Sequence, residues 1–158
     1  MPDTTVSLWL DTKKYPKLTL PTRGSALASG YDLCAAEDAV VGSTHDLKDA
    51  KVVHTGVWLA YLDPAYEIQI RPRSGNSLKR KFIVANTPGT VDADYRGEIG
   101  IIVWYYGPGE LQIKAGEKLA QMVVSPVIRP ELRAVSDEEF KRLSDTQRGA
   151  AGYGSTGR

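Results

Sequence analysis

Two acidic residues near the middle of the chain, Asp92 and Asp94, are the first candidates for chemistry. They lie within residues 86–97, between two runs rich in β-branched and aromatic side chains. Paired carboxylates can serve as a general base or hold a cation, and both would share one face if the backbone stays extended. Asn86 and Tyr95 flank them, offering an amide to read a polar edge and a ring to stack on. The alternative is the charged tip of a β-hairpin.

A basic stretch is the second candidate site. Residues 71–81 contain five Arg or Lys side chains and no acid. Pro72 and Gly75 favour a turn whose backbone N–H groups point outward. Together with the guanidinium of Arg73 and the hydroxyl of Ser74, such a turn suits phosphate oxygens. A basic surface loop is the alternative. Ser74 is not expected to be a covalent nucleophile, because neither histidine of the chain stands in a triad or elbow context.

Two single polar residues stand in otherwise small or apolar surroundings. Asp32 follows a glycine turn within residues 28–33, where it could be a capping or solvated carboxylate. It could also be an outer-sphere contact to a Mg²⁺ ion that keeps several waters, since such an ion needs only one or two carboxylates. Gln121 is polar among the apolar residues 119–124, although strand alternation could simply turn it to solvent.

The C-terminal residues, 148–158, contain four glycines and almost nothing that could be buried. Glycines free the backbone to wrap an anion, while Arg148 adds a guanidinium and Tyr153 adds a ring. The segment is not a Walker loop, because it lacks the Gly-Lys-Ser/Thr step. A disordered tail is the alternative. We therefore expect one domain over residues 1–147 and a flexible arm over residues 148–158.

Length and composition exclude several classes of protein. The chain has 158 residues and a net charge of +1, which gives no global electrostatic reason to bind nucleic acid or a membrane. No apolar run approaches the roughly 18 residues of a membrane span, and no secretory signal is visible. His45, His54 and the single cysteine, Cys34, offer no zinc constellation and no intrachain disulfide.

The hydrophobic pattern predicts many short β-strands and little helix. Turn residues separate runs that are rich in Val, Ile, Tyr and Trp. These runs cover residues 6–10, 51–62, 66–70, 82–85, 98–106, 111–113 and 119–127. A capping box formed by Ser136 and Glu139 predicts one short helix near the C-terminus. The pattern indicates an all-β fold, which would be a sandwich, a jelly roll or a barrel.

Taken in order, these five chemical segments closely resemble the five motifs of the trimeric dUTPase family. The resemblance extends from Thr22 to Gly157. It is carried by Asp92-Ala93-Asp94-Tyr95-Arg96-Gly97, by Arg73-Ser74-Gly75 and by Arg148-Gly149 with the glycine-rich residues 152–157. It implies a jelly-roll-like β domain that forms a homotrimer, with each active site built from three subunits. It also implies Mg²⁺-dependent hydrolysis of dUTP to dUMP and diphosphate, which supplies dUMP for thymidylate synthesis and limits uracil in DNA.

The resemblance further implies a role for each matching residue. Asp92 would be the base that activates water for attack on the α-phosphorus, Tyr95 would pack under the deoxyribose, and Asp32 would touch the water shell of Mg²⁺. Uracil would be read by the backbone up to Asp92 and by Asn86, Gly89, Thr90 and Val91. The triphosphate would be held by Arg73, Ser74, Gly75 and Gln121. The tail would close over the nucleotide through Arg148, Tyr153, Gly154, Ser155 and Thr156.

Three other functions share parts of this pattern. A dCTP deaminase has the same architecture but usually pairs its Arg-Ser motif with a catalytic glutamate, where this chain has Asp92. A nucleotide-gated signalling trimer would use the fold without catalysis, and the intact Asp92 and complete tail argue against it. A nucleic-acid-binding β domain would need aromatic residues interleaved with the basic run. The expected location is cytoplasmic, or the nucleus or host cytoplasm for a eukaryotic or viral source.

Overall fold

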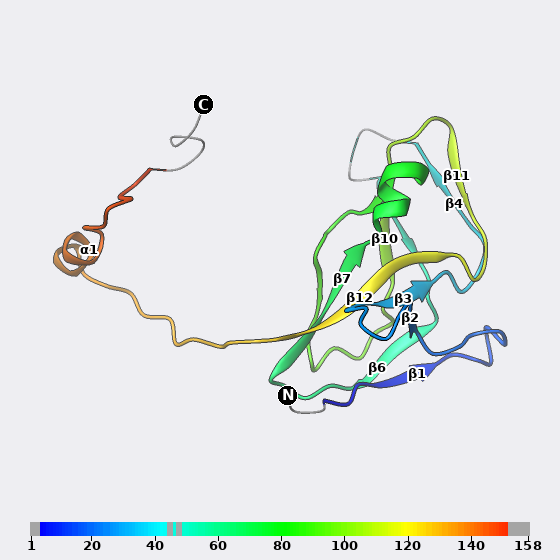
Figure 1. Ribbon diagram of the computed structural model, residues 1–158, viewed down its shortest axis with the longest axis horizontal. Coiled ribbons are helices and arrows are strands. Elements are labelled where there is room, and N and C mark those ends of the chain that lie inside the picture. The colour runs from blue at the N-terminus through cyan, green and yellow to red at the C-terminus, as the bar shows by residue number, and fades with distance from the viewer. Residues whose placement is uncertain (1–3, 44–45, 47–48, 152–158) are drawn as a thin grey trace. The chain divides into compact units, whose positions relative to one another are not determined.

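The computed structural model describes residues 4–43, 46 and 49–151 (Figure 1). The chain separates into two compact units, Met1–Ile128 and Arg129–Arg158. The β-strands of the described residues belong to the first unit, and an α-helix, α1 (Asp137–Leu143), belongs to the second. Nowhere in the described part of the chain is there a helix with the length and apolar character needed to span a bilayer.

The strands of the first unit pair antiparallel. The largest sheet has five strands in the order β2 (Thr22–Arg23), β3 (Tyr31–Cys34), β12 (Lys118–Pro126), β7 (Tyr66–Pro72) and β9 (Gly89–Val91). A three-stranded sheet has the order β5 (Lys51–Val53), β10 (Ile101–Tyr105) and β8 (Phe82–Val84). Two further pairs are β1 (Ser7–Leu10) with β6 (Val57–Tyr61), and β4 (Ala39–Gly42) with β11 (Glu110–Ile113).

Alternation along the strands builds the core. In β10 the side chains of Ile101, Val103 and Tyr105 are buried while those between them are partly exposed, the period of two that a pleated strand requires. Every sheet contributes to one buried cluster, whose fully buried members include Leu33, Val41, Val53, Leu59 and Ile68. The all-β fold with one short C-terminal helix, expected from the sequence, is confirmed.

The strand boundaries differ from the sequence prediction in two ways. The run 51–62 is not one strand, because it breaks at residues 54–56 into β5, which pairs with β10, and β6, which pairs with β1. The short strands β2, β3, β4 and β9 were not predicted, because runs of only two to four residues are too short to show a clear alternation. A short π-helix, η2 (Asn76–Arg80), was also unexpected.

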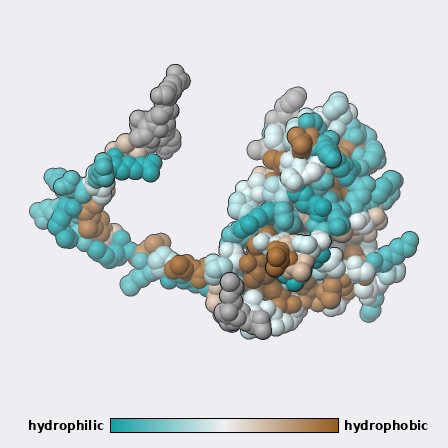
Figure 2. Space-filling view, viewed as in Figure 1, coloured by the Kyte–Doolittle hydropathy of each residue, from teal (hydrophilic) through white to brown (hydrophobic). Residues whose placement is uncertain are grey.

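The second unit begins with an extended segment and contains α1. The hydroxyl of Ser136 accepts a hydrogen bond from the backbone N–H of Glu139 at 3.2 Å, so the predicted cap and helix are confirmed. Several large apolar side chains of this unit are exposed, among them Leu132 (90%), Phe140 (62%) and Leu143 (53%). Figure 2 shows apolar surface along this unit between hydrophilic stretches.

Candidate active site

A row of polar side chains crosses the large sheet where β3, β12 and β7 lie side by side. The register places Asp32 of β3 opposite Gln121 of β12, and Gln121 opposite Arg71 of β7. Directly opposed residues point to the same face of a sheet. Asp32, Gln121 and Arg71, distant in the sequence, therefore share one surface, and Arg73 leaves the end of β7 beside it.

Asp32 is the electrostatic centre of this group. Its side chain is only 11% exposed, and each carboxylate oxygen contacts a cation. Oδ1 accepts from Nη1 of Arg73, and Oδ2 lies 2.8 Å from Nζ of Lys118. A carboxylate this buried is stable as an anion only when it is paired. The structure thus joins two of the predicted site residues, Asp32 and Arg73, and adds Lys118, which sequence reasoning did not assign.

Gln121 does not turn away to solvent. Its side chain is half-buried, and Nε2 donates to the carbonyl of Pro72 at 3.0 Å. A β-carbon built on Gly30 would lie 2.4 Å from Oε1 of Gln121, so the amide lies directly against the backbone of Gly30. The glycine of the turn before Asp32 therefore leaves room for the amide of β12.

The turn after β7 is fixed by backbone and amide contacts. The carbonyl of Arg73 accepts from the backbone N–H groups of Asn76 at 3.0 Å and Ser77 at 3.1 Å. Nδ2 of Asn76 donates to the carbonyls of Lys118 and Leu119, each at 2.9 Å. Ser74 and Gly75 at the tip of this turn are exposed. Asn76 was not predicted to have a role, because its partners are remote in the sequence.

Several residues of the segment 86–100 line a pocket of about 220 Å³ that is separate from the polar row. The pocket is lined by Ile70, Val84, Asn86, Gly89, Thr90, Val91, Asp92, Tyr95, Glu98, Ile99 and Gly100. The predicted uracil-reading residues thus gather around one hollow with Asp92 and Tyr95. Asn86 lies against Gly89, since a β-carbon on this glycine would be 3.0 Å from the amide nitrogen. The side chain of Asp92 is exposed.

The structure does not show the β-hairpin that was the alternative for residues 86–97. β8 pairs with β10 rather than with β9, and β9 pairs with β7 in the other sheet, so the segment is a crossing between sheets. The backbone also does not stay extended, because the N–H of Tyr95 donates to the carbonyl of Asp92 at 3.0 Å and closes a turn. The strand alternation that would have set Asp92 and Asp94 on one face is therefore absent.

The polar row and the pocket are separate features of one chain. The register of β9 sets Gly89 opposite Ile70 and Val91 opposite Ile68, so the chain moves away from Arg73 as it approaches Asp92. The five residue steps from Ile68 to Arg73 span about 17 Å at the rise of an antiparallel strand. The predicted site residues therefore form two separate groups on one chain, one around Asp32 and one around Asp92.

The tail residues are described only in part. Arg148 belongs to the second unit, where its Nε donates to the carbonyl of Ala151 at 3.0 Å. The predicted contacts of Tyr153, Gly154, Ser155 and Thr156 lie outside the described residues.

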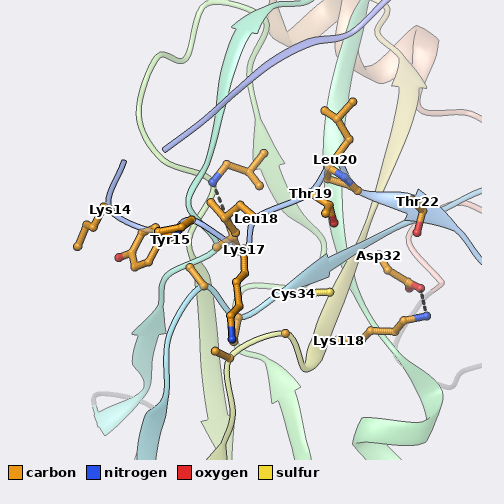
Figure 3. A pocket seen from close by; sticks show the side chains of 18 residues that line it. Lys14, Tyr15, Lys17, Leu18, Thr19, Leu20, Thr22, Asp32, Cys34 and Lys118 are labelled. Atoms are coloured by element: carbon orange, nitrogen blue, oxygen red, sulfur yellow. Dashed lines mark hydrogen bonds and ion pairs between the residues drawn. The ribbon is translucent and has the colours of Figure 1, made fainter. Parts of the chain in front are cut away.

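A larger cavity, of about 500 Å³, lies behind Asp32, with the segment 14–22 along one side (Figure 3). Figure 3 shows Asp32, Lys118 and Cys34 together at one end of it. Burial raises the pKa of the Cys34 thiol, and the charge of Lys118 opposes that effect. A thiol with a raised pKa stays protonated near neutrality and is a poor nucleophile.

The donors available to a metal ion are few. Among the described residues no three His, Cys, Asp or Glu side chains gather as a ligand set. Asp32 already uses both carboxylate oxygens on Arg73 and Lys118. These side chains therefore do not suit direct ligation, but they suit a hydrated cation whose inner shell comes from phosphate oxygens and water.

Comparison with known proteins gives a consistent result. The family model for dUTPase matches residues 16–157. A deoxyuridine 5'-triphosphate nucleotidohydrolase of Gloeothece citriformis is 45% identical over 146 residues, covering 92% of this chain and 94% of the relative. The corresponding protein of Desulfotalea psychrophila is 39% identical over 150 residues, covering 95% of each chain.

Comparison with solved structures also finds dUTPases. The dUTPase of Staphylococcus bacteriophage 80alpha with dUpNHpp has a TM-score of 0.81 and 26% identity, covering 98% of this chain and 99% of the phage chain. A mutant dUTPase from phage phi11 of S. aureus, in which a structural Mg(II) ion is coordinated, has a TM-score of 0.73 and 26% identity. The match covers 84% of this chain and 97% of the phage chain. The resemblance read from the five sequence segments is confirmed, and the chain belongs to the dUTPase family.

Proposed function

We propose that this protein hydrolyses dUTP to dUMP and diphosphate by attack of water on the α-phosphorus. The observation that carries the proposal is the family match over residues 16–157, nearly the whole chain. Two features support it: a pocket lined by Asp92 and Tyr95, and a cationic cluster around Asp32 that suits phosphates. Such a reaction supplies dUMP for thymidylate synthesis and keeps uracil out of DNA.

The pocket of residues 86–100 takes the uracil and the deoxyribose. Asn86 and the backbone from Gly89 through Thr90 and Val91 to Asp92 read the edge of the base. Cytosine presents donors and acceptors in exchanged positions, and each buried mismatch costs roughly 1–3 kcal/mol. The methyl group of thymine is excluded sterically. Tyr95 lies under the sugar, where a ribose 2′-hydroxyl would collide with its ring.

The triphosphate binds at the other group of residues. Arg73 offers a guanidinium fork, Ser74 a hydroxyl, Gly75 a backbone close to the surface, and Gln121 an amide. Arg73 is paired with Asp32 without substrate, so its charge is already directed toward the sheet surface. Positive charge and N–H groups fixed in advance around the phosphates stabilise the charge that develops in phosphoryl transfer.

Asp92 is the general base. Its carboxylate orients one water molecule toward the α-phosphorus and accepts the proton that this water loses as the P–O bond to the leaving diphosphate breaks. Proton transfer to a positioned base is typically worth about 10²- to 10⁴-fold in rate. Asp92→Asn is therefore expected to lose activity by about that factor while dUTP binding persists, as measured by calorimetry.

Asp32 would hold a nucleotide-borne Mg²⁺ through the water of its shell, and the ion would supply positive charge that lowers the repulsion between phosphate and attacking water. Support for Mg²⁺ comes from the phage phi11 dUTPase, whose structure describes the coordination of a structural Mg(II) ion. Support for an outer-sphere contact comes from the poor inner-sphere donor set among the described residues and from the pairing of both Asp32 oxygens with cations.

We propose that the active site is shared within a homotrimer. Support comes from the direction of β9, since five residue steps along β7, about 17 Å, separate Arg73 from Ile68, the strand partner of Val91. One copy would supply Arg73 and Gln121, and a second would supply Asp92 and Tyr95. The arm over residues 148–158, distinct from the domain over residues 1–147, would close over the nucleotide from a third. The expected location is the cytoplasm.

The test is pyrophosphate release by the purified protein with Mg²⁺, offering dUTP, dTTP, dCTP and UTP separately beside Asp92→Asn. Fast release from dUTP alone, lost in the variant, is the expected result. Tight dUTP binding without release would overturn catalysis in favour of a nucleotide-binding trimer. Ammonia formed from dCTP would instead identify a deaminase.

A further inference from the structure

Glu98 occupies the break between β5 and β6, where the sequence predicted a continuous strand. Its Oε1 accepts from the backbone N–H groups of Thr55 at 2.9 Å and Gly56 at 2.7 Å. Its Oε2 lies 2.8 Å from Nδ1 of His54. The carboxylate thus satisfies the donors that a sheet partner would have taken, and charge-assisted bonds of this kind are the stronger ones.

The backbone around Glu98 is attached to the same segment. Thr55 is fully buried, and its hydroxyl donates to the carbonyl of Ile99 at 2.7 Å. The N–H of Ile99 donates to the carbonyl of Val57 at 2.8 Å, and Glu98 forms an isolated bridge with Trp58. Residues 98–99 are therefore fixed on the β5–β6 connection by both backbone and side chain.

Tyr95 takes its position from this anchored backbone. Its hydroxyl donates to the carbonyl of Glu98 at 3.0 Å. A β-carbon on Gly97 would lie 2.2 Å from the same hydroxyl oxygen, so the phenol end of the ring lies flat against the glycine. The side chain is otherwise 43% exposed, which leaves the Glu98 carbonyl as a principal constraint on the ring.

We propose that Glu98 is a positioning residue for Tyr95 and thereby sets the discrimination between deoxyribose and ribose substrates. The inference rests on the proposed function, in which Tyr95 lies under the sugar. The carboxylate holds residues 98–99 on the β5–β6 connection, the Glu98 carbonyl then holds the Tyr95 hydroxyl, and the fixed ring excludes a 2′-hydroxyl. A displacement of about 1 Å at such a contact can change rates by roughly 100-fold.

The experiment compares kcat/KM for dUTP and UTP in wild type, Glu98→Ala and Glu98→Gln. Glu98→Ala is expected to reduce the dUTP preference by roughly 10- to 100-fold, because the ring loses its fixed position. Glu98→Gln is expected to stay within about threefold of wild type, since its amide oxygen still accepts both N–H groups. An unchanged preference in folded Glu98→Ala overturns the proposal.

Asp38→Ala is the matched control. The Asp38 carboxylate also accepts a backbone N–H, from Ala115 at 2.9 Å, and pairs with Lys114 at 2.7 Å, but neither Asp38 nor Lys114 lines the pocket. This variant is expected to lower Tm without altering the dUTP preference. If Glu98→Ala does not fold, Glu98→Asp replaces it, because its shorter side chain cannot reach both N–H groups. A wild-type preference in Glu98→Asp then overturns the proposal.

A readout without activity separates this inference from the proposed function. Protein containing fluorotyrosine gives a ¹⁹F resonance for Tyr95, identified by its loss in Tyr95→Phe. In Glu98→Ala this resonance is expected to move toward that of a freely rotating tyrosine, and in Asp38→Ala it is expected to stay. A wild type inactive on dUTP would overturn the proposed function alone, whereas an unmoved Tyr95 resonance in Glu98→Ala would overturn the role of Glu98.

Discussion

At the scale of single residues, the phosphate-facing group depends on close contacts between side chain and backbone. Gln121 keeps its amide beside Asp32 only because Gly30 has no side chain, and the missing β-carbon would lie 2.4 Å from Oε1. The amide is also held by the Pro72 carbonyl. The position of one hydrogen-bonding group thus depends on a residue that has no polar group of its own.

Gly30→Ala is expected to displace the Gln121 amide and weaken phosphate binding. Losing one hydrogen bond to a charged group costs about 1.5–3 kcal/mol, so KM for dUTP is expected to rise about tenfold or more. Gly24→Ala is the matched control, since a β-carbon there meets nothing within 4 Å. Steady-state kinetics measure KM for dUTP in both variants. The same KM in Gly30→Ala and Gly24→Ala would show that phosphate binding does not depend on Gln121.

Sequence reasoning identified residues whose own chemistry is unusual for their surroundings. Asp32 in an apolar stretch, Arg73 in a basic turn and Gln121 in an apolar strand were selected this way, and the structure brings them together. Lys118 and Asn76 were missed because their importance lies in partners remote in the sequence. A single sequence gives the type of each residue but not its partner on a neighbouring strand, because the register between strands is fixed only by tertiary packing.

At the scale of elements, the break between β5 and β6 moves the chain from the three-stranded sheet to the pair with β1. Residues 51–62 are rich in strand-forming side chains, which is why the sequence predicted one strand. Gly56, with φ at +66°, makes the turn that propensity alone did not reveal. β9 was missed because its three residues, Gly-Thr-Val, are too few to show a pattern and their strand conformation depends on pairing with β7.

A pair of glycine variants separates backbone strain from steric conflict at this break. Gly109 has φ at +68° and open space where a β-carbon would stand, so Gly109→Ala is expected to cost about 1 kcal/mol. At Gly56 the β-carbon would lie 2.4 Å from Cδ1 of Leu18, so Gly56→Ala is expected to cost roughly 1–3 kcal/mol more. Urea denaturation measures the free energy of unfolding of both variants. An equal loss of stability in the two would mean that Leu18 moves aside freely.

At the scale of the whole molecule, the register of β9 on β7 directs the chain away from Arg73 as it approaches Asp92. In the proposed homotrimer, Arg73 of one copy and Asp92 of another complete each site. The sequence resemblance implies such a shared site, whereas composition and periodicity do not indicate it, because they carry no information on strand pairing.

Mixing two inactive variants tests the shared site. Asp92→Asn and Arg73→Ala chains are each expected to be inactive alone. Unfolded together in equal amounts and refolded, they are expected to recover about a quarter of the wild-type activity, because that share of sites receives both intact residues in a random cyclic trimer. A site contained in one chain would give no recovery, and each variant refolded alone is the control.

In the proposed homotrimer, the division of each site between copies makes activity a matter of mass action. A chain that supplies only part of a site is inactive when alone, and the number of complete sites in dilute solution grows with the cube of the free-chain concentration. The specific activity of such a trimer is expected to fall on dilution. A cell that halves the amount of the chain near the threshold for assembly would then lose far more than half of its capacity to remove dUTP.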